Sequence, residues 1–105
     1  MNVYQAEIAD IFIIEPKKFE DKRGYFFESF KQNDFNSKIS SIHFVQENQS
    51  YSNKNVLRGM HYQKSPMQQG KLVRVVAGSV YDVALDIRKE SPSYGKWISE
   101  VLSND

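Results

Sequence analysis

The feature that most constrains the fold is a period of two in the hydrophobic pattern, which is typical of β-strands. The period is clearest over residues 71–87, where two alternating runs flank Ala77-Gly78. Such a dipeptide between alternating runs predicts a β-hairpin. A two-residue turn would place Lys71 opposite Ala84 and within diagonal reach of Asp82. The pattern therefore predicts that Lys71 and Asp82 share one face of a sheet.

The rest of the chain follows the same period, with one exception. Residues 31–40 place Phe35 and Ile39 four apart, which favours one short amphipathic helix. The chain is therefore predicted to be a single all-β domain, residues 1–105, built as an antiparallel sandwich or barrel with one helix. The last strand has no successor, so we expect it at a sheet edge or covered by a partner. The further strands are predicted over residues 8–14, 24–30, 42–52, 56–63 and 96–102.

Composition excludes several classes of function. The chain has 14 Lys and Arg against 13 Asp and Glu, whereas a general nucleic-acid-binding protein carries a large basic surplus. No apolar run approaches the ~18 residues of a membrane span, and the N-terminus lacks the regions of a signal peptide. We therefore expect a cytoplasmic protein. Cysteine is absent, which excludes disulfides, thiolate-bound metals and thiol catalysis.

Several polar side chains fall on the predicted strands. His61 follows Arg58 by three residues, so a bulge at Gly59 would be needed to turn both toward one cavity. Inward-facing amides can read the edge of a base, because they carry paired donors and acceptors. Two pairs of residues, two apart in the sequence, share a strand face: Phe26 with Glu28, and Gln46 with Asn48.

Each of these residues also has an ordinary structural interpretation. Exposed strand faces commonly carry Gln, Asn and Glu, and a single histidine is more often packed or exposed than catalytic. Lys71 and Asp82 would form a plain cross-strand ion pair if their face were open to solvent. The residues alone leave both interpretations open.

Four segments, taken together, resemble the dTDP-4-dehydrorhamnose 3,5-epimerases, enzymes with a cupin-like double-stranded β-helix, or jelly-roll, fold. The resemblance covers nearly the whole chain, in the family's order and spacing. It implies proton exchange at the two carbons that flank the 4-keto group of dTDP-4-dehydro-6-deoxy-D-glucose. The product would be dTDP-4-dehydro-L-rhamnose, an intermediate of dTDP-L-rhamnose biosynthesis, and no cofactor is implied. The segments are FEDKRGYFFE (19–28), FVQENQSYS (44–52), VLRGMHYQ (56–63) and QGKLVRVVAGSVYDV (69–83).

The resemblance also implies roles for individual residues. His61 matches the general base, and Lys71 matches the cation near the ketone oxygen, with Asp82 in support. Arg23 and Arg58 match contacts to the diphosphate and the sugar. In the family, the neighbouring subunit of a dimer built by strand exchange completes each site. The nucleotide subsite is matched by Phe26, Glu28, Gln46 and Asn48, with Glu47 beside them.

A comparison with metal-binding cupins argues against a metal at this site. Those proteins carry a His-x-His pair and, later, a Glu seven residues before a turn glycine. Here the pair reads His61-Tyr62-Gln63, and Lys71 stands seven residues before Gly78. A cation in place of a carboxylate ligand disfavours a divalent metal, so we expect none.

The family's proteins continue past residue 105, and their later strands supply a tyrosine general acid and the carboxylate that orients the histidine. We therefore expect a fragment or a truncated gene product, its jelly-roll truncated on the C-terminal side. Without those groups the 105-residue chain is expected to be a poor epimerase. Two alternatives remain: a sibling sugar-nucleotide isomerase on the same fold, and a non-catalytic cupin that binds nucleotide sugars.

Overall fold

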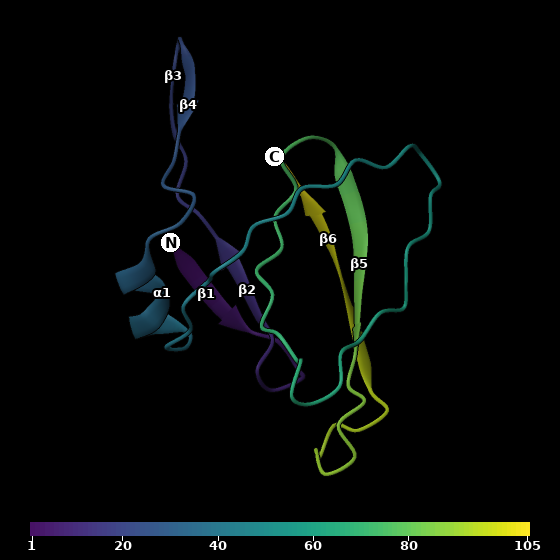
Figure 1. The fold of residues 1–105 in the computed structure, drawn as a ribbon. Coiled ribbons are helices and arrows are strands. Elements are labelled where there is room, and N and C mark those ends of the chain that lie inside the picture. Colours follow the sequence, from purple (N-terminus) through teal and green to yellow (C-terminus); the bar gives the residue numbers. More distant parts are fainter. The chain divides into compact units, whose positions relative to one another are not determined.

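A computed structural model describes all residues, 1–105, and contains six strands and one helix (Figure 1). The strands pair as three antiparallel two-stranded sheets, β1–β2, β3–β4 and β5–β6. The chain divides into two compact units, residues 1–41 with 73–105, and residues 42–72. The elements are β1 (Asn2–Gln5), β2 (Phe12–Glu15), β3 (Phe19–Asp21), β4 (Gly24–Phe26), α1 (Gln32–Lys38), β5 (Ser79–Leu85) and β6 (Trp97–Ser103).

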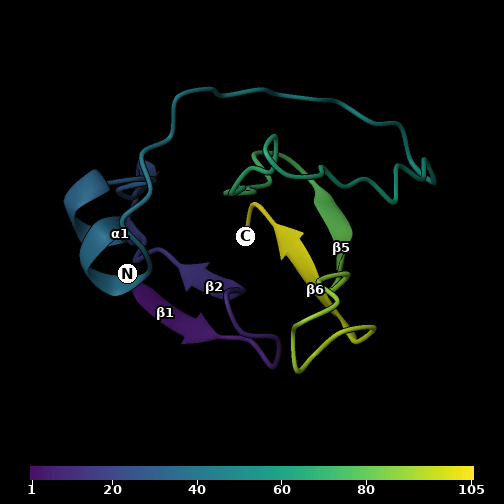
Figure 2. The ribbon, with the colours of Figure 1, turned by 60° about the horizontal axis from the view of Figure 1, so that its bottom comes forward.

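The helix forms where its pattern predicted it. Phe35 is buried, 7% exposed, and its ring lies 6.0 Å from that of Phe30. Asp34 in the first turn and Lys38 in the last suit the helix dipole. The helix lies beside β1 (Figures 1 and 2), and Lys38 Nζ donates a hydrogen bond to the Met1 carbonyl oxygen at 3.3 Å. With seven residues, α1 cannot span a membrane, and no other helix is present.

The first unit also confirms parts of the two strands predicted over residues 8–14 and 24–30. Strand β2 falls at the end of the run 8–14, and β4 at the start of the run 24–30. Ile8, expected within a strand, instead lies in the connection between β1 and β2, where it is the most buried apolar side chain at 2% exposed. Strands β1 and β3 were not predicted, because each is too short to show alternation and is defined by its hydrogen bonds to the neighbouring strand.

The predicted hairpin at Ala77-Gly78 is wrong, because β5 pairs with β6 instead. Ala84 lies opposite Ile98, not Lys71, and residues 71–76 form no strand. A type I′ turn needs a positive φ at both central residues, and a type II′ turn needs it at the first. Only Gly78, the second residue, has a positive φ, of 79°. Strand β6 confirms the strand expected over residues 96–102 and has a single strand neighbour, so it is a sheet edge.

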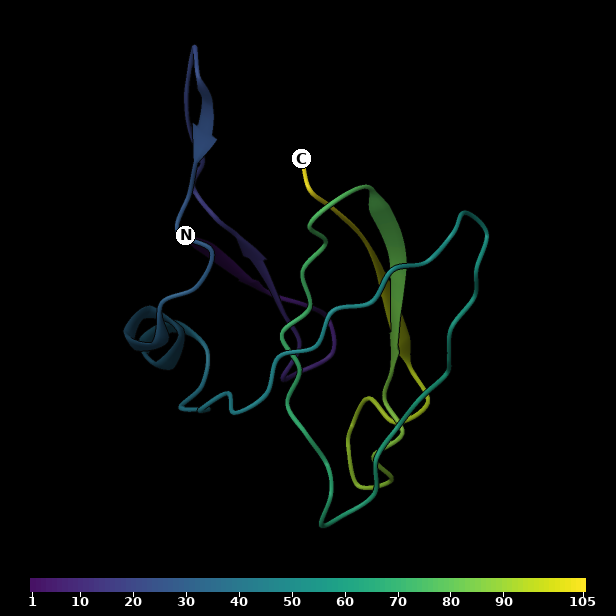
Figure 3. The same ribbon diagram turned by 45° about the horizontal axis from the view of Figure 1, so that its top comes forward.

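The second unit, residues 42–72, contains neither helix nor strand (Figure 3), so the strands predicted over 42–52 and 56–63 are wrong. Every side chain in it is exposed except that of Phe44, which is half-buried. A period of two in the hydrophobic pattern indicates only that side chains alternate along an extended chain. A strand also needs a neighbour for its backbone hydrogen bonds, and the unit's own turns at 53–56 and 64–67 do not supply one.

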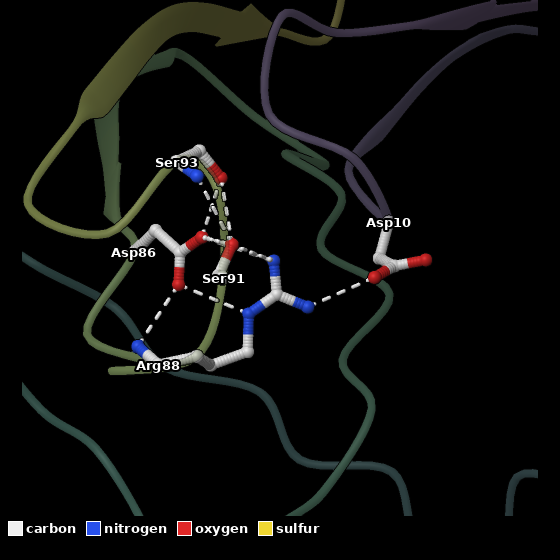
Figure 4. Close-up of polar contacts among 5 residues, drawn as sticks. All are labelled: Asp10, Asp86, Arg88, Ser91 and Ser93. Carbon is white, nitrogen blue, oxygen red and sulfur yellow. Dashed lines mark hydrogen bonds and ion pairs between the residues drawn. The ribbon is translucent and has the colours of Figure 1, made fainter.

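The connection from β5 to β6 is organised around the side chain of Asp86, which is 1% exposed (Figure 4). Its carboxylate accepts hydrogen bonds from the hydroxyls of Ser91 and Ser93, both at 2.6 Å. Arg88 donates from Nε and Nη2, both at 3.0 Å, and its Nη1 reaches Asp10 at 2.8 Å. The hydrogen bonds from Arg88, Ser91 and Ser93 hold the pKa of Asp86 far below its ordinary value.

This network predicts acid-sensitive stability. Because the folded-state pKa of Asp86 is depressed, its contribution is fully present above the unfolded-state pKa of ~3.9 and is lost as the pH falls below it. D86N should remove that part of the pH dependence and lower the melting temperature at pH 7 by about 5 °C or more.

Thermal melts followed by circular dichroism between pH 7 and pH 2 would measure both effects. Glu90 supplies the matched control, because E90Q neutralises an exposed carboxylate of the same connection that has no hydrogen-bond partner. An unchanged melting temperature for D86N would contradict the role given to Asp86.

Candidate functional site

The predicted site residues are divided between the two units. The first unit contains Arg23, Phe26, Glu28 and Asp82, and the second contains Gln46, Glu47, Asn48, Arg58, His61 and Lys71. We also predict that Lys71, Asp82 and His61 line one cavity: the alternation motivates the first two residues, and the family resemblance adds His61.

Arg23 stands in the two-residue turn of the β3–β4 hairpin, between Asp21 and Gly24, which are the last paired residues. Its side chain is 84% exposed. Asp21 Oδ1 accepts a hydrogen bond from the backbone N–H of Arg23 at 2.8 Å and from Nε at 3.2 Å, and Nη2 donates to Oδ2. This pairing lowers the pKa of the Asp21 carboxyl and raises the pKa of the Arg23 guanidinium. The guanidinium therefore has a defined position despite its exposure.

Phe26 lies opposite Phe19 on the same hairpin, and the two rings are 72% and 56% exposed. Lys17 Nζ lies 5.1 Å from the centre of the Phe19 ring, as a cation–π contact. Glu28 follows β4 and is exposed. Exposed aromatic rings can stack on a base, and the arginine of the same hairpin can pair with a phosphate.

Asp82 lies in β5, half-buried, directly opposite Glu100 of β6. Like charges directly opposite each other destabilise a strand pair. A cation placed against this face would relieve the repulsion. Lys71, the predicted cation, belongs to the second unit, so its pairing with Asp82 stays a prediction.

The second unit brings Gln46 and Asn48 together, with Gln46 Nε2 donating to Asn48 Oδ1 at 3.3 Å. This contact brings together the two amides that were predicted to share a strand face, although residues 42–52 form no strand. The contact uses one donor and one acceptor, so both amides keep further groups for a ligand. Glu47 between them is exposed and has no hydrogen-bond or ion-pair partner.

Arg58 is fixed across the turn at residues 53–55. Its Nε donates to Ser52 Oγ at 2.9 Å, and its Nη2 donates to the Tyr51 carbonyl oxygen at 2.8 Å. As with Arg23, one edge of the guanidinium is engaged within the protein. The Nη1 group of Arg58 remains for an anion or a sugar hydroxyl.

His61 and Lys71 are exposed and make no hydrogen bond or ion pair. Gly59, two residues before His61, has a φ of 127°, a conformation that side chains rarely allow. The predicted bulge is not formed, since no strand is present, but Gly59 does interrupt the extended backbone. An unpaired imidazole and an unpaired ammonium can exchange protons and stabilise negative charge on a ligand.

Asp21 is a candidate that the sequence analysis missed. The detectable signal was an Asp two residues before an Arg and three before a Gly, a spacing typical of turns in which the Asp side chain accepts a backbone N–H. The segment that contains Asp21 was not predicted to be a strand, because β3 has only three residues.

Comparison with known proteins gives the family. The sequence profile of the dTDP-4-dehydrorhamnose 3,5-epimerases matches residues 5–105. The enzyme of that name from Shigella flexneri is 56% identical over 104 residues, which cover 98% of this chain and 58% of the relative. This chain therefore spans little more than half the length of that relative.

Two solved structures superpose on this chain. The dTDP-6-deoxy-D-glucose-3,5-epimerase of Legionella pneumophila Philadelphia 1, in complex with dTDP-4-keto-L-rhamnose, is 48% identical with a TM-score of 0.90, covering 98% of this chain and 55% of that one. The dTDP-4-dehydrorhamnose 3,5-epimerase of Bacillus anthracis Ames, with TDP and PPi bound, is 38% identical with a TM-score of 0.94, covering 98% and 59%. With a family match over nearly its whole length, this chain belongs to the dTDP-4-dehydrorhamnose 3,5-epimerase family.

Proposed function

We propose that this chain provides the nucleotide subsite and the general base of a dTDP-4-dehydrorhamnose 3,5-epimerase. The observation that carries the proposal is the family match over residues 5–105. The sugar nucleotide held by the Legionella relative supports the substrate class. The substrate would be dTDP-4-dehydro-6-deoxy-D-glucose, and the product dTDP-4-dehydro-L-rhamnose, for dTDP-L-rhamnose biosynthesis.

The proposed reaction is proton exchange at a carbon beside a ketone. His61 removes the proton, and the electron pair of the broken C–H bond moves onto the carbonyl oxygen to give an enolate. The ammonium of Lys71 stabilises that negative charge. A general acid outside residues 1–105 would give a proton to the opposite face while the electron pair returns from the oxygen to carbon, which re-forms the C–H bond with inverted configuration. His61 then loses its proton to solvent, and the second flanking carbon reacts in the same way. The exposure of His61 and Lys71, both unpaired, supports these roles.

The nucleotide part of the substrate would be held away from the reacting carbons. Phe26 would stack on the base, while Arg23 and Arg58 would contact the diphosphate and the sugar. The two arginines already have ordered guanidinium groups, which reduces the entropy lost on binding. The remaining polar contacts to the substrate would come from Glu28, Gln46, Glu47 and Asn48. Asp82 would support Lys71.

The same relatives support a fold and an assembly. We infer that residues 1–105 belong to one cupin-like jelly-roll domain, in a cytoplasmic homodimer built by strand exchange. The TM-scores of 0.90 and 0.94 over 98% of the chain support the fold. Exposed apolar side chains on the β5–β6 sheet, such as Tyr81 and Val101 at 66% and 63%, support a covering partner.

A chimaera tests the proposal. Residues 1–105 would replace the aligned segment of the Shigella relative, which is 56% identical to this chain over 104 aligned residues. We expect the chimaera to exchange deuterium from solvent into both carbons beside the ketone. Exchange with a different product would favour a sibling isomerase. Binding of dTDP without exchange would favour a non-catalytic cupin and would contradict the proposed reaction.

The role of His61 predicts a separation of catalysis from binding. In the chimaera, His61→Ala should slow deuterium exchange by ~10²–10⁴-fold, because a general base is removed. Binding of dTDP, measured by titration calorimetry, should persist, because the residues proposed to hold the nucleotide do not include His61. His43→Ala alters the only other histidine of the chain and should leave both unchanged. Full exchange activity in the His61 variant would exclude His61 as the base.

The role of Lys71 predicts that its removal slows the chemical step of the reaction. Lys71→Met keeps much of the side-chain volume but removes the charge that stabilises the enolate, so exchange should slow by roughly 10²-fold or more. Lys64→Met, an exposed lysine of the same unit, is the matched control. If the two variants exchange at equal rates, Lys71 does not stabilise the enolate.

The arrangement also predicts a reaction that needs no metal. Gln63 and Lys71 stand where metal-binding cupins carry ligands, and no cluster of three His, Asp or Glu side chains is present. Treatment with EDTA, followed by dialysis, should leave deuterium exchange by the chimaera unchanged. Loss of exchange that returns on adding Zn²⁺, Fe²⁺ or Mn²⁺ would overturn this prediction.

A further inference from the structure

We propose that Asp21 is a positioning residue for the substrate diphosphate, acting through Arg23. The inference rests on the function proposed above and adds a residue to it. Asp21 holds the guanidinium of Arg23 in an orientation that leaves its outer edge free for phosphate oxygens.

The hydrogen bonds of the turn define that orientation. Asp21 Oδ1 accepts from the backbone N–H of Arg23 at 2.8 Å and from Nε at 3.2 Å, while Nε also lies 3.1 Å from Oδ2. Nη2 donates to Oδ2. A guanidinium carries five N–H groups, and these contacts use the Nε–Nη2 edge. Both N–H groups of Nη1 and the second of Nη2 remain, and they form a fork suited to phosphate.

The backbone supports the same arrangement. Asp21 pairs with Gly24 across the turn, and Gly24 has a φ of 127°. Glycine reaches that φ at no steric cost, so this residue lets the chain close the tight turn that places Arg23 beside Asp21. Because Phe26 follows Gly24 by two residues, Asp21 and Phe26 lie on one face of the hairpin. The predicted base-stacking ring and the ordered guanidinium therefore share a face.

A second Asp-x-Arg pair in the same unit shows what such an arginine can bind. Asp86 Oδ1 accepts from the backbone N–H and from Nε of Arg88, both at 3.0 Å, and Nη2 donates to Oδ2 at 3.0 Å (Figure 4). The free Nη1 of Arg88 then contacts the carboxylate of Asp10 at 2.8 Å. The pair at Asp21 repeats this geometry, but the Nη1 of Arg23 has no partner within the chain. An arginine held in this way thus keeps an anion-binding edge.

Electrostatics alone predicts the opposite effect for Asp21. A carboxylate beside an anion-binding arginine repels a diphosphate, so its removal should strengthen binding. If Asp21 positions Arg23, removal of the Asp21 carboxylate should weaken diphosphate binding, because the Arg23 guanidinium loses its orientation. The sign of the change therefore distinguishes the two.

The test compares Asp21→Asn with Glu20→Gln in the chimaera. Each variant removes one negative charge from β3, and Glu20 has no ion-pair or hydrogen-bond partner. Titration calorimetry would use dTDP and, as a probe without the diphosphate, thymidine. We expect Asp21→Asn to weaken dTDP binding by about tenfold and to leave thymidine binding unchanged. Glu20→Gln should leave dTDP binding equal or slightly tighter. Kinetics of deuterium exchange should show a raised KM with kcat nearly unchanged.

A double-mutant cycle guards against a general disruption of the hairpin. If Asp21 acts through Arg23, Asp21→Asn should have no further effect on dTDP binding in an Arg23→Gln background. An equal loss of binding in both backgrounds, or tighter dTDP binding by Asp21→Asn, would overturn the inference. If the parent chimaera binds no dTDP, the proposed function fails, and this inference fails with it. If the parent binds dTDP and Asp21→Asn behaves like Glu20→Gln, only the inference fails.

Discussion

The largest sheet of the chain depends on the buried carboxylate of Asp86. A buried charge is costly unless it is fully hydrogen-bonded, and this one accepts from two hydroxyls, a guanidinium and a backbone N–H. The backbone of Asp86 continues the β5–β6 ladder, since its N–H and carbonyl oxygen pair with Lys96 and Gly95 at 2.8 Å each. The carboxylate thereby orders the connection whose two ends set the register of β5 and β6. Through Arg88, the same group also holds Asp10, in the bend between β1 and β2.

The sequence could predict those parts of the fold that depend on residues close together in the chain, and not those that depend on distant partners. The helix was predictable because its signal is local: Phe35 must find an apolar contact within one or two turns. The strand over residues 97–103 was predictable for the same reason. The partner of β5 was not, because alternation identifies a strand and not its neighbour. Ala77 has no positive φ, which a two-residue hairpin turn of type I′ or II′ requires at its first central residue, and alanine rarely adopts that φ.

The candidate site was predictable to a different extent. Gln46 and Asn48 do touch, as a shared face requires, and Arg23 and Phe26 do lie on one hairpin. These are relations between residues close in sequence. The predicted meeting of Lys71 and Asp82 was a relation between strands, and it rested on a turn that does not form. The roles proposed for them rest on the family to which the chain belongs, and not on the alternation.

The two Asp-x-Arg pairs show how burial changes the use of one local structure. At Asp86 the carboxylate is 1% exposed, and the outer edge of its arginine is already occupied by Asp10, so the pair stabilises the fold. At Asp21 the carboxylate is 48% exposed and its arginine 84% exposed. An exposed ion pair contributes little to stability, because water screens it and two side chains must be ordered. The ordering at Asp21 therefore has small value for folding. It has larger value for a site that must present a guanidinium to a diphosphate, because the entropy of fixing that side chain is lost before the ligand arrives.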